Sequence, residues 1–577
     1  MLRNFLPDSA AAEPIKRALQ ACKQHFWWAA LFSAWVNLLY LTPTLYMMQV
    51  YDRVVPTGGI TTLALLTIAM IAALASLSAL DWLRSRLLLR SSLRLDRLLS
   101  APILGRLASQ DTHSSNTRVL REFDHVRTAM SGQATLALFD APWTPIYLLC
   151  CFMLHPAIGV FTLVGGTALF LLATANERAN RNTLKDAMNA TNSAYAAQEA
   201  LTGQFEIVRA LGMREASIRQ QIGARRGAVL TQAAGQITSG NYNSLIKFLR
   251  LSLQSLSLGL AAWLTVKGQV SAGAIIASSV LLSRAVAPIE ILVGAWPSIV
   301  QAKASWKVIL DLFSQPPSEE DRATQLPAPT GRLNLENVSL RHQGTEDAQL
   351  RLISLDVRPG QTLGIIGPSG SGKSSLARII AGGLRPTGGT IRLDDAAYEA
   401  WDGDRLAQFI GYLPQSPSLF PGTIKENIAR FSTMTEADKD TIDQQVMDAA
   451  QAAGAHRLIL QLPKGYDTQL GPFGTGVSAG QAQRIALARA LFRNPILLIL
   501  DEPNSNLDHE GEVALNQAIK KSAERGAAVI LIAHRAGILS QVDRLALMNG
   551  GKLVTEGPRE QVLRSIRTPN TNPAPAQ

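Results

Sequence analysis

The chain has 577 residues, which is too long for a single hydrophobic core and predicts several domains. It is 47% hydrophobic and only 17% charged, whereas soluble proteins carry about 25% charged residues. The net charge of +11 would suit binding of nucleic acid, but the basic residues flank long apolar segments and no aromatic residues are interleaved with them. The composition therefore indicates a membrane protein and disfavours a nucleic-acid partner.

Six apolar segments in the first half are long enough to cross a bilayer as helices. No Asp, Glu, Lys or Arg occurs in residues 24–51, 54–80 or 141–176. The predicted spans are residues 26–48, 60–81, 135–155, 157–176, 246–266 and 272–298. Residues 1–25 are mixed in composition and contain no cleavable signal, so they are predicted to form a short cytoplasmic segment.

Arginine and lysine set the predicted orientation. The short loops after the first, third and fifth spans contain only Arg53 and Lys267, whereas residues 82–133 and 177–245 are long and rich in arginine. Both termini are therefore predicted to face the cytoplasm. The two long segments are expected to continue the spans as helices below the membrane, which gives a membrane domain over residues 26–313.

A second domain is predicted after a proline-rich polar linker at residues 314–332. The apolar runs TLGII, ILLILD and AVILIAH alternate with helical stretches over residues 333–564, which is typical of a parallel sheet flanked by helices. Residues 565–577 are predicted to form a disordered tail. The three cysteines have neither disulfide nor metal-site spacing.

A glycine-rich loop follows TLGII and precedes a helix, which is the context required of the phosphate-binding motif G-x-x-x-x-G-K-[ST]. Its backbone N–H groups can cradle phosphates, its lysine can neutralise them and its serine can hold Mg²⁺. The residues assigned to nucleotide binding are Gly367, Pro368, Ser369, Gly370, Ser371, Gly372, Lys373, Ser374 and Ser375.

Two adjacent carboxylates, Asp501 and Glu502, end the buried strand ILLILD, where ligands sit in open α/β sheets. Neighbouring strand residues point to opposite faces and can therefore have separate roles. We expect Asp501 to hold Mg²⁺ and Glu502 to act as general base toward the attacking water.

From Leu333 to Leu563 the chain resembles an ATP-binding cassette. The phosphate loop is followed in order by GYLPQSP, the signature VSAGQ, the two carboxylates, SNLD and LIAHR. The resemblance implies an α/β cassette with a helical subdomain, in which Gln415 senses the γ-phosphate beside the metal and His534 holds that phosphate and the water. Asp508 would contact the opposite subunit. His342 stands where related domains often have an aromatic residue that stacks on adenine.

The resemblance implies a dimer, because in this family the signature of one cassette completes the ATP site of the other. Ser478, Gly480 and Gln481 match the usual motif, while Val477 and Ala479 replace its leucine and first glycine. An alanine is tolerated there if its φ is negative and costly otherwise. The most direct assembly is a homodimer with two ATP molecules and Mg²⁺.

Six spans followed by a cassette resemble an ABC exporter. The stretches TPTLYMMQVYDRVVPTGG, ALFDAPWTPIYL, SAGAIIASSVLLSRAVAPIE and LDEPNSNLDHEGE narrow the resemblance to the ATPase-permeases of type I protein secretion, in the protease- and lipase-exporting subgroup without an N-terminal peptidase domain. This implies export of unfolded polypeptides with a C-terminal signal across a bacterial inner membrane. It also implies a membrane-fusion adaptor and an outer-membrane channel as partners.

Two other functions are alternatives to protein export. A lipid or drug exporter would have the same architecture, and a regulatory ATP sensor is disfavoured because Lys373 and Glu502 are both present.

Arg284 and Glu290 lie within the sixth predicted span, where ionisable groups tend to face cavities or partners. We hypothesise that Arg284 lines the substrate path; the alternatives are a structural ion pair or a helix that has already left the membrane. Asp52 and Arg53 either contact the adaptor or solvate their loop.

Overall fold

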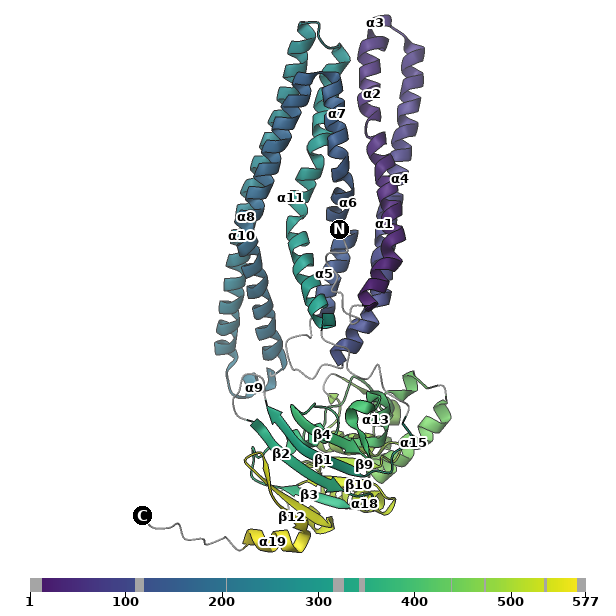
Figure 1. Cartoon of the computed structure of the whole chain (residues 1–577), viewed down its shortest axis with the longest axis vertical. Coiled ribbons are helices and arrows are strands. Elements are labelled where there is room, and N and C mark those ends of the chain that lie inside the picture. The colour runs from purple at the N-terminus through teal and green to yellow at the C-terminus, as the bar shows by residue number, and fades with distance from the viewer. Residues whose placement is uncertain are drawn as a thin grey trace, which may run out of the picture. The chain divides into compact units, whose positions relative to one another are not determined.

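The computed structural model describes residues 13–108, 119–203, 205–314, 326–341, 348–436, 438–471, 474–533 and 537–567. The chain divides into two compact units, Met1–Pro316 and Pro317–Gln577, shown in Figure 1. Most of the predicted linker lies outside the described residues. Helix α19 (Arg559–Arg567) covers the first three residues of the predicted tail, and the rest of the tail is not described.

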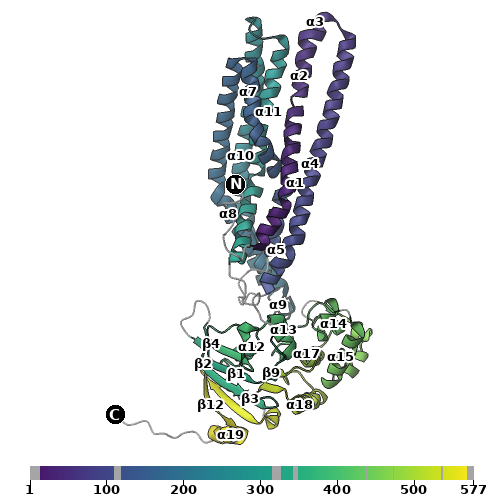
Figure 2. The same cartoon turned by 45° about the vertical axis from the view of Figure 1, so that its right-hand side comes forward.

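The first unit consists of helices. In chain order these are α1 (Glu13–Leu39), α2 (Thr42–Gln49), a π-helical turn (Val50–Val54), α3 (Val55–Thr57), α4 (Ile60–Ala108), α5 (Val119–Ser131), α6 (Gln133–Asp140), α7 (Thr144–Leu154), α8 (Pro156–Gly203), α9 (Phe205–Ala210), α10 (Arg214–Val266) and α11 (Ala272–Ser314). Helix α1 packs along α4, and α8 packs along α10 (Figures 1 and 2). With 53 residues α10 is about 80 Å long, far more than a bilayer requires.

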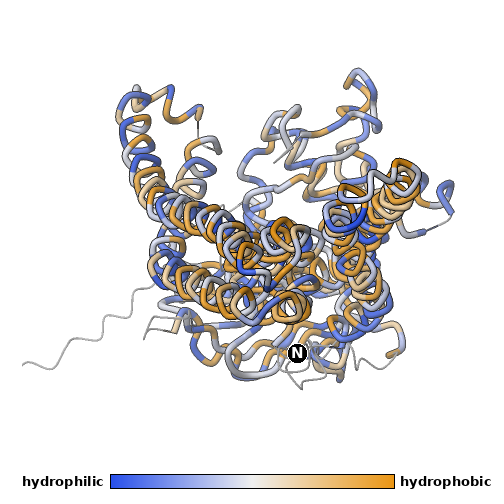
Figure 3. The backbone as a smooth tube through the Cα atoms, turned by 90° about the horizontal axis from the view of Figure 1, so that it is seen from above, coloured by the Kyte–Doolittle hydropathy of each residue, from blue (hydrophilic) through white to orange (hydrophobic). Residues whose placement is uncertain are grey.

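Five helical stretches of this unit are long and apolar enough to cross a membrane: Ile60–Ala108, Val119–Leu154, Pro156–Glu199, Arg214–Val266 and Ala272–Ser314. The first predicted span, residues 26–48, is divided between α1 and α2 at Tyr40 and Leu41. Pro43 follows in the first turn of α2, where a missing backbone N–H costs nothing. No residue in the apolar window of α4 is buried within the chain, as lipid contact requires. Figure 3 shows the hydropathy along the backbone from above, with hydrophobic (orange) segments in the helices.

A polar network joins α1, α4 and α6 inside the apolar unit. Arg84 is 4% exposed and pairs with Asp81 and Asp140, both at 2.7 Å. The Asp140 carboxylate also accepts hydrogen bonds from Ser33 Oγ and Asn37 Nδ2, each at 2.7 Å. The buried charges are thus compensated by partners from three helices.

The second unit is built on two main sheets. The six-stranded sheet has the order β12-β11-β3-β10-β9-β6, with five parallel strands and β12 antiparallel at one edge. Its strands are β3 (Thr362–Ile366), β6 (Ile410–Leu413), β9 (Leu497–Asp501), β10 (Ala528–Ile532), β11 (Arg544–Asn549) and β12 (Lys552–Pro558). An antiparallel sheet has the order β2-β1-β4-β5, from β1 (Leu333–Arg341), β2 (Ala348–Val357), β4 (Gly388–Leu393) and β5 (Ala396–Ala397). A two-stranded ribbon pairs β7 (Gly422–Thr423) with β8 (Gln469–Leu470).

The central strands β9 and β10 are buried on both faces, because helices and the second sheet cover them. Alternate residues enter two cores: Leu498 and Leu500 pack in one, Leu497 and Ile499 in the other. The helices are α12 (Lys373–Ile380), α13 (Gly403–Phe409), α14 (Ile424–Ile428), α15 (Lys439–Ala452), α16 (His456–Leu460), α17 (Ala479–Leu491) and α18 (His509–Glu524), besides α19. Helices α14, α15 and α17 gather at one side of the unit as a helical subdomain (Figure 2).

Candidate nucleotide-binding site

The phosphate loop connects the end of β3 to the start of α12. Gly367, Gly370 and Gly372 have φ values of 155°, 80° and 94°, which disfavour any side chain. A Cβ at Gly367 would lie 2.2 Å from Met548 O, and one at Gly372 would lie 2.6 Å from a Leu350 methyl. The backbone conformation therefore favours glycine at all three positions, and close packing adds to this at Gly367 and Gly372.

Lys373 begins α12 and folds back over the loop. Its Nζ donates to Gly367 O at 3.0 Å and to Pro368 O at 2.9 Å. Burial lowers the pKa of Lys373, while the nearby Glu502 and Asp501 carboxylates oppose that shift. The lysine is thus held at the loop with its ammonium group among backbone oxygens that a phosphate can replace.

The remaining residues of the loop divide between surface and interior. Pro368, Ser369 and Gly370 are exposed, whereas Ser374 and Ser375 are half-buried. Ser371 is 2% exposed, and its Oγ has no hydrogen-bond partner among the described residues. Buried polar groups are normally satisfied, so this hydroxyl is consistent with a loop that binds a polar ligand.

Asp501 and Glu502 lie at the carboxyl end of β9, two strands from the phosphate loop. Burial raises the pKa of Asp501, and its hydrogen bond with Ser374 partly offsets this shift. Asp501 Oδ1 has no hydrogen-bond partner among the described residues. A buried carboxylate oxygen next to a serine hydroxyl is an oxygen pair of the kind that Mg²⁺ prefers, so the residues present fit that ion.

Glu502 has a left-handed backbone with φ of 49°, which is unfavourable for a non-glycine residue. Its N–H donates to Ile532 O at 2.9 Å, and its own carbonyl accepts from Ser505 N at 3.3 Å. The turn away from β9 is therefore fixed by hydrogen bonds on both sides. The left-handed conformation of Glu502 thus turns the chain away from β9 directly after Asp501.

The signature motif forms the start of α17. Ser478 is its N-cap: Ser478 Oγ accepts from Gln481 N at 3.3 Å, and Gln481 Oε1 accepts from Ser478 N at 2.9 Å. Ala479 is exposed and is not among the residues with positive φ, so its methyl group is tolerated. Gly480 is the constrained position, because a Cβ there would lie 2.9 Å from Asn506 O.

Asp508 caps α18 and accepts a hydrogen bond from Gly511 N at 2.9 Å. It also forms an ion pair with Arg484, whose side chain is 8% exposed. The Gly511 hydrogen bond and the Arg484 guanidinium hold the pKa of Asp508 below its usual range. Arg484 was missed by the sequence analysis, although an arginine directly before the apolar run IALARAL is placed to need a partner.

Three predicted residues complete the set. Gln415 is exposed in the loop after β6, whose Leu413 pairs with Leu500, so it reaches the same edge of the sheet as Asp501. His534 comes two residues after the end of β10 and lies outside the described residues, as does His342 after β1. The structure thus gathers the phosphate loop, Asp501, Glu502 and Gln415 at the carboxyl ends of the parallel strands.

Three ionisable residues that the sequence singled out in the membrane unit, Arg284, Glu290 and Asp52, have structural partners. The Arg284 guanidinium lies 3.8 Å from the centre of the Tyr40 ring, and Glu290 pairs with Arg250 at 3.0 Å. Asp52 accepts hydrogen bonds from Ser271 Oγ and Gly273 N, both at 2.6 Å. Asp52 therefore caps the start of α11 as well as being exposed to solvent.

Comparison with known proteins agrees with this geometry. A family model described as ABC transporter matches residues 350–505. The chain is 40% identical over 559 residues to the type I secretion system ATP-binding protein PrsD of Rhizobium meliloti (strain 1021), covering 96% of this chain and 94% of that protein. It is 28% identical over 551 residues to the leukotoxin translocation ATP-binding protein LktB of Mannheimia haemolytica, covering 93% of this chain and 76% of that protein.

The fold is that of an ABC exporter. A solved structure of a bacterial Atm1-family ABC exporter with ATP bound matches 96% of both chains with a TM-score of 0.78 and 21% sequence identity. The relative PrsD is 40% identical to this chain over nearly the whole length of both proteins. The chain therefore belongs to the family of type I secretion system ATP-binding proteins. It is a multi-pass membrane protein and a nucleotide-binding ATPase for protein export, which confirms the predicted family, fold class and enzyme class.

Proposed function

We propose that two copies of this chain form an exporter that moves unfolded polypeptides with a C-terminal secretion signal across a bacterial inner membrane. The observation that carries the proposal is the 40% identity to a type I secretion ATP-binding protein, because it extends over both units and not over the cassette alone. Residues 26–313 form the membrane domain and residues 333–564 the cassette, and both termini face the cytoplasm.

Exposure of the signature supports the dimer. Ser478 and Ala479 are exposed, and the capping box presents the serine at the N-terminus of α17, where a helix favours anions. In the proposed homodimer, Ser478, Gly480 and Gln481 reach the γ-phosphate held by the partner, and Asp508 contacts the partner at the same interface. Each nucleotide then lies between the phosphate loop of one subunit and the signature of the other.

The nucleotide is ATP with Mg²⁺ in this proposal. Lys373 binds the β- and γ-phosphates, and Ser374 and Asp501 hold the metal, with Gln415 beside it. Glu502 orients and deprotonates the attacking water, and His534 holds the γ-phosphate. Ser371 Oγ and Asp501 Oδ1 are buried and have no hydrogen-bond partner among the described residues, which supports a charged ligand at this position. His342 is proposed to stack on adenine.

Two further proteins complete the proposed conduit. A membrane-fusion adaptor would contact the outer side of the membrane domain, and an outer-membrane channel would receive the polypeptide. The Asp52 carboxylate already accepts hydrogen bonds from Ser271 Oγ and Gly273 N within the chain. Arg53 is therefore the better candidate of the two for an adaptor contact.

Secretion of a co-encoded protein tests this function. Cells expressing the chain, the adaptor, the channel and the candidate substrate should secrete the substrate, and Glu502→Gln should abolish secretion. Removal of the substrate's C-terminal segment should also keep it inside the cell. ATPase activity that responds to lipid but to no signal-bearing polypeptide would favour the lipid or drug exporter instead.

A further inference from the structure

Helix α4 carries a row of three arginines shortly after its apolar segment. Arg86, Arg90 and Arg94 are four residues apart, so they are neighbours on one face of the helix. All three are exposed, and none pairs with a carboxylate among the described residues. Trp82 begins the same row, and the Arg86 guanidinium lies 4.2 Å from the centre of its ring. Like charges at this spacing repel each other, so the arginine row favours a bound anion.

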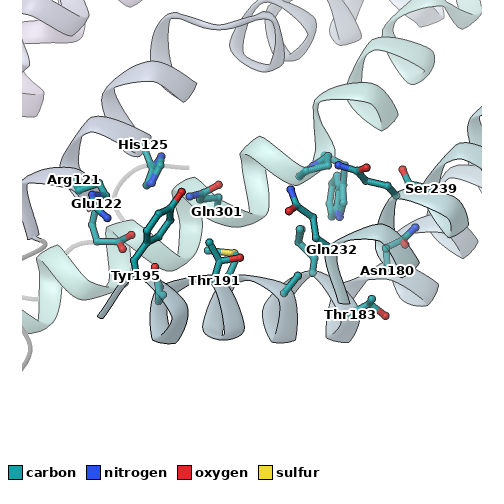
Figure 4. A pocket seen from close by; sticks show the side chains of 18 of the residues that line it. Arg121, Glu122, His125, Asn180, Thr183, Thr191, Tyr195, Gln232, Ser239 and Gln301 are labelled. Atoms are coloured by element: carbon teal, nitrogen blue, oxygen red, sulfur yellow. The ribbon is translucent and has the colours of Figure 1, made fainter. Parts of the chain in front are cut away.

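Three charged side chains that face the interior of the membrane unit do have neighbours that compensate them. Arg84, on another face of α4, is buried and pairs with two carboxylates. Figure 4 shows Arg121 and Glu122 at one end of a cavity between α5, α8, α10 and α11. Glu122 accepts from Ser305 Oγ at 2.5 Å, and the Arg121 guanidinium lies 5.9 Å from the Tyr195 ring. The arginine row differs because its charges point outward and are left to a partner outside the chain.

Exposed tryptophans indicate the depth of the row in the membrane. Trp82 is 55% exposed directly after the predicted span at residues 60–81, and Trp28 is 47% exposed on α1. The two helices run antiparallel and are joined by the hydrogen bond from Arg84 to Ser33 Oγ at 2.6 Å. Trp28 precedes Ser33 by five residues and is therefore level with the part of α4 that carries the first two arginines. Tryptophan is enriched at the boundary between hydrocarbon and headgroups, which places the start of the row there.

The helical rise decides which arginines reach lipid phosphates. Arg86 lies about 6 Å beyond Trp82 along the helix, Arg90 about 12 Å and Arg97 about 22 Å. The headgroup layer is about 5–8 Å thick on each side of the hydrocarbon core. Long arginine side chains extend toward that layer, so Arg86 and Arg90 reach it and Arg97 does not.

The positive field of the row extends to the neighbouring helix α1. Burial lowers the pKa of His25, which precedes the first span, and the charges of Arg94 and Arg90 lower it further. The groove between α1 and α4 is therefore electropositive next to the headgroup layer.

We propose that Trp82, Arg86 and Arg90 bind an anionic phospholipid, with its phosphate between the two guanidinium groups and its acyl chains along the apolar window of α4. Guanidinium groups form strong charge-assisted hydrogen bonds with phosphate. None of the residues of the apolar window is buried within the chain, and that window leads directly to the arginines. The proposed orientation makes this the cytoplasmic leaflet. The inference goes beyond the proposed export function and does not depend on the exported substrate.

The combination of an apolar and a basic surface favours a lipid over other anions. Inorganic phosphate would gain nothing from the apolar window, and an acidic polypeptide would have to leave water to reach it. A zwitterionic lipid brings a positive group close to the arginines together with its phosphate. An anionic phospholipid matches both surfaces, since its chains are apolar and its headgroup carries net negative charge.

Native mass spectrometry of the purified, delipidated full-length protein in a neutral detergent tests the site. Phosphatidylglycerol should bind more tightly than phosphatidylcholine. Arg86→Gln combined with Arg90→Gln should weaken phosphatidylglycerol binding at least about tenfold, as expected for lost hydrogen bonds to a charged group. Arg97→Gln removes the same charge outside the headgroup layer and should change the affinity less than about twofold. Lysine at positions 86 and 90 should restore part of the binding.

Several outcomes would overturn the proposal. These are equal affinity for the two lipids, unchanged phosphatidylglycerol binding in the double glutamine variant, or an equal loss in Arg97→Gln. Displacement of the lipid by millimolar inorganic phosphate would identify a site for free anions instead. Binding of a polyglutamate peptide that is lost in the double variant, without loss of lipid binding, would identify a surface for acidic polypeptides. Thermal unfolding of each variant controls for loss of fold.

A further comparison separates a resident lipid from a transported one and from the export function. Glu502→Gln should bind phosphatidylglycerol as the unaltered chain does, because the site lies on the membrane unit and not at the nucleotide. Lipid binding that requires ATP would indicate cargo and reject a resident lipid. Loss of secretion in Glu502→Gln with lipid binding intact would support both proposals. Absence of secretion by the unaltered chain with its adaptor, channel and substrate would count against the export function and leave the lipid site standing.

Discussion

Two substitutions at neighbouring positions of the signature, Gly480→Ala and Ala479→Gly, should have opposite effects on ATPase turnover. Gly480→Ala places a Cβ 2.9 Å from Asn506 O, a separation that real Cβ atoms essentially never show. The obstacle is a backbone oxygen, so either α17 or the loop containing Asn506 must move. Ala479→Gly creates no contact, because residue 479 is exposed and its backbone does not have positive φ.

The magnitudes follow from these geometries. Overpacking by one methyl group costs about 1–3 kcal/mol. If this whole cost adds to the activation free energy of hydrolysis in the closed dimer, the rate falls about 5- to 150-fold. Ala479→Gly loses at most about 1 kcal/mol of helix propensity in the first turn of α17, away from the chemistry. Its ATPase rate should therefore equal or exceed that of the natural chain.

ATPase turnover of purified protein in lipid nanodiscs measures both effects, and thermal unfolding of the same samples controls for loss of fold. Gly480→Ala should lose turnover while it keeps a cooperative unfolding transition, lowered by no more than the overpacking cost. Ala479→Gly should keep both its turnover and its unfolding transition. Unchanged turnover in Gly480→Ala would show that the close approach to Asn506 does not constrain the working dimer. A large loss in Ala479→Gly would show that the alanine itself is required.

Three further predictions concern the remaining charged groups. Glu502→Gln should trap an ATP-bound dimer with turnover reduced at least about a hundredfold, measured as phosphate release; turnover like that of the natural chain would reject the general base. Lys373→Ala should weaken ATP binding in equilibrium titration, and an unchanged affinity would contradict its phosphate role. Asp140→Ala removes one carboxylate from the buried Arg84, which keeps Asp81, and leaves Ser33 and Asn37 without their acceptor, so it should cost about 1–3 kcal/mol of stability. The surface control Glu13→Ala, whose partner Arg17 is exposed, should cost less than about 1 kcal/mol, and equal losses of unfolding temperature in the two variants would refute the difference.

Local motifs explain what the sequence could predict about the site. The phosphate loop lies within eight consecutive residues between a strand and a helix, and Asp501 and Glu502 end one buried strand. Such short segments determine their own backbone geometry, so residue types suffice to recognise them. The left-handed backbone of Glu502 was not predictable, because nothing in its residue type requires it.

Contacts between residues far apart in the chain could not be predicted from sequence patterns. Arg84 and Asp140 are 56 positions apart, and Asp52 and Gly273 are 221 apart, yet each pair forms a hydrogen bond. Hydropathy placed the membrane helices but did not show the break at Tyr40 and Leu41 in the first span. Chain topology determines these features, because only packing of the helices brings the partners together.

The signature helix and the Asp508 loop are joined at three points, which has a consequence for the ATP-driven cycle. Gln483 Nε2 donates to Pro503 O at 3.0 Å, Gly480 approaches Asn506 O, and Arg484 pairs with Asp508. These contacts reach Pro503, Asn506 and Asp508 of one loop from one face of α17. Ser478 and Asp508 therefore move as one body, so closure of the proposed dimer delivers both to the opposite subunit together. Arg484→Leu should separate them, because the helix start would keep its own cap while Asp508 retained only its bond to Gly511.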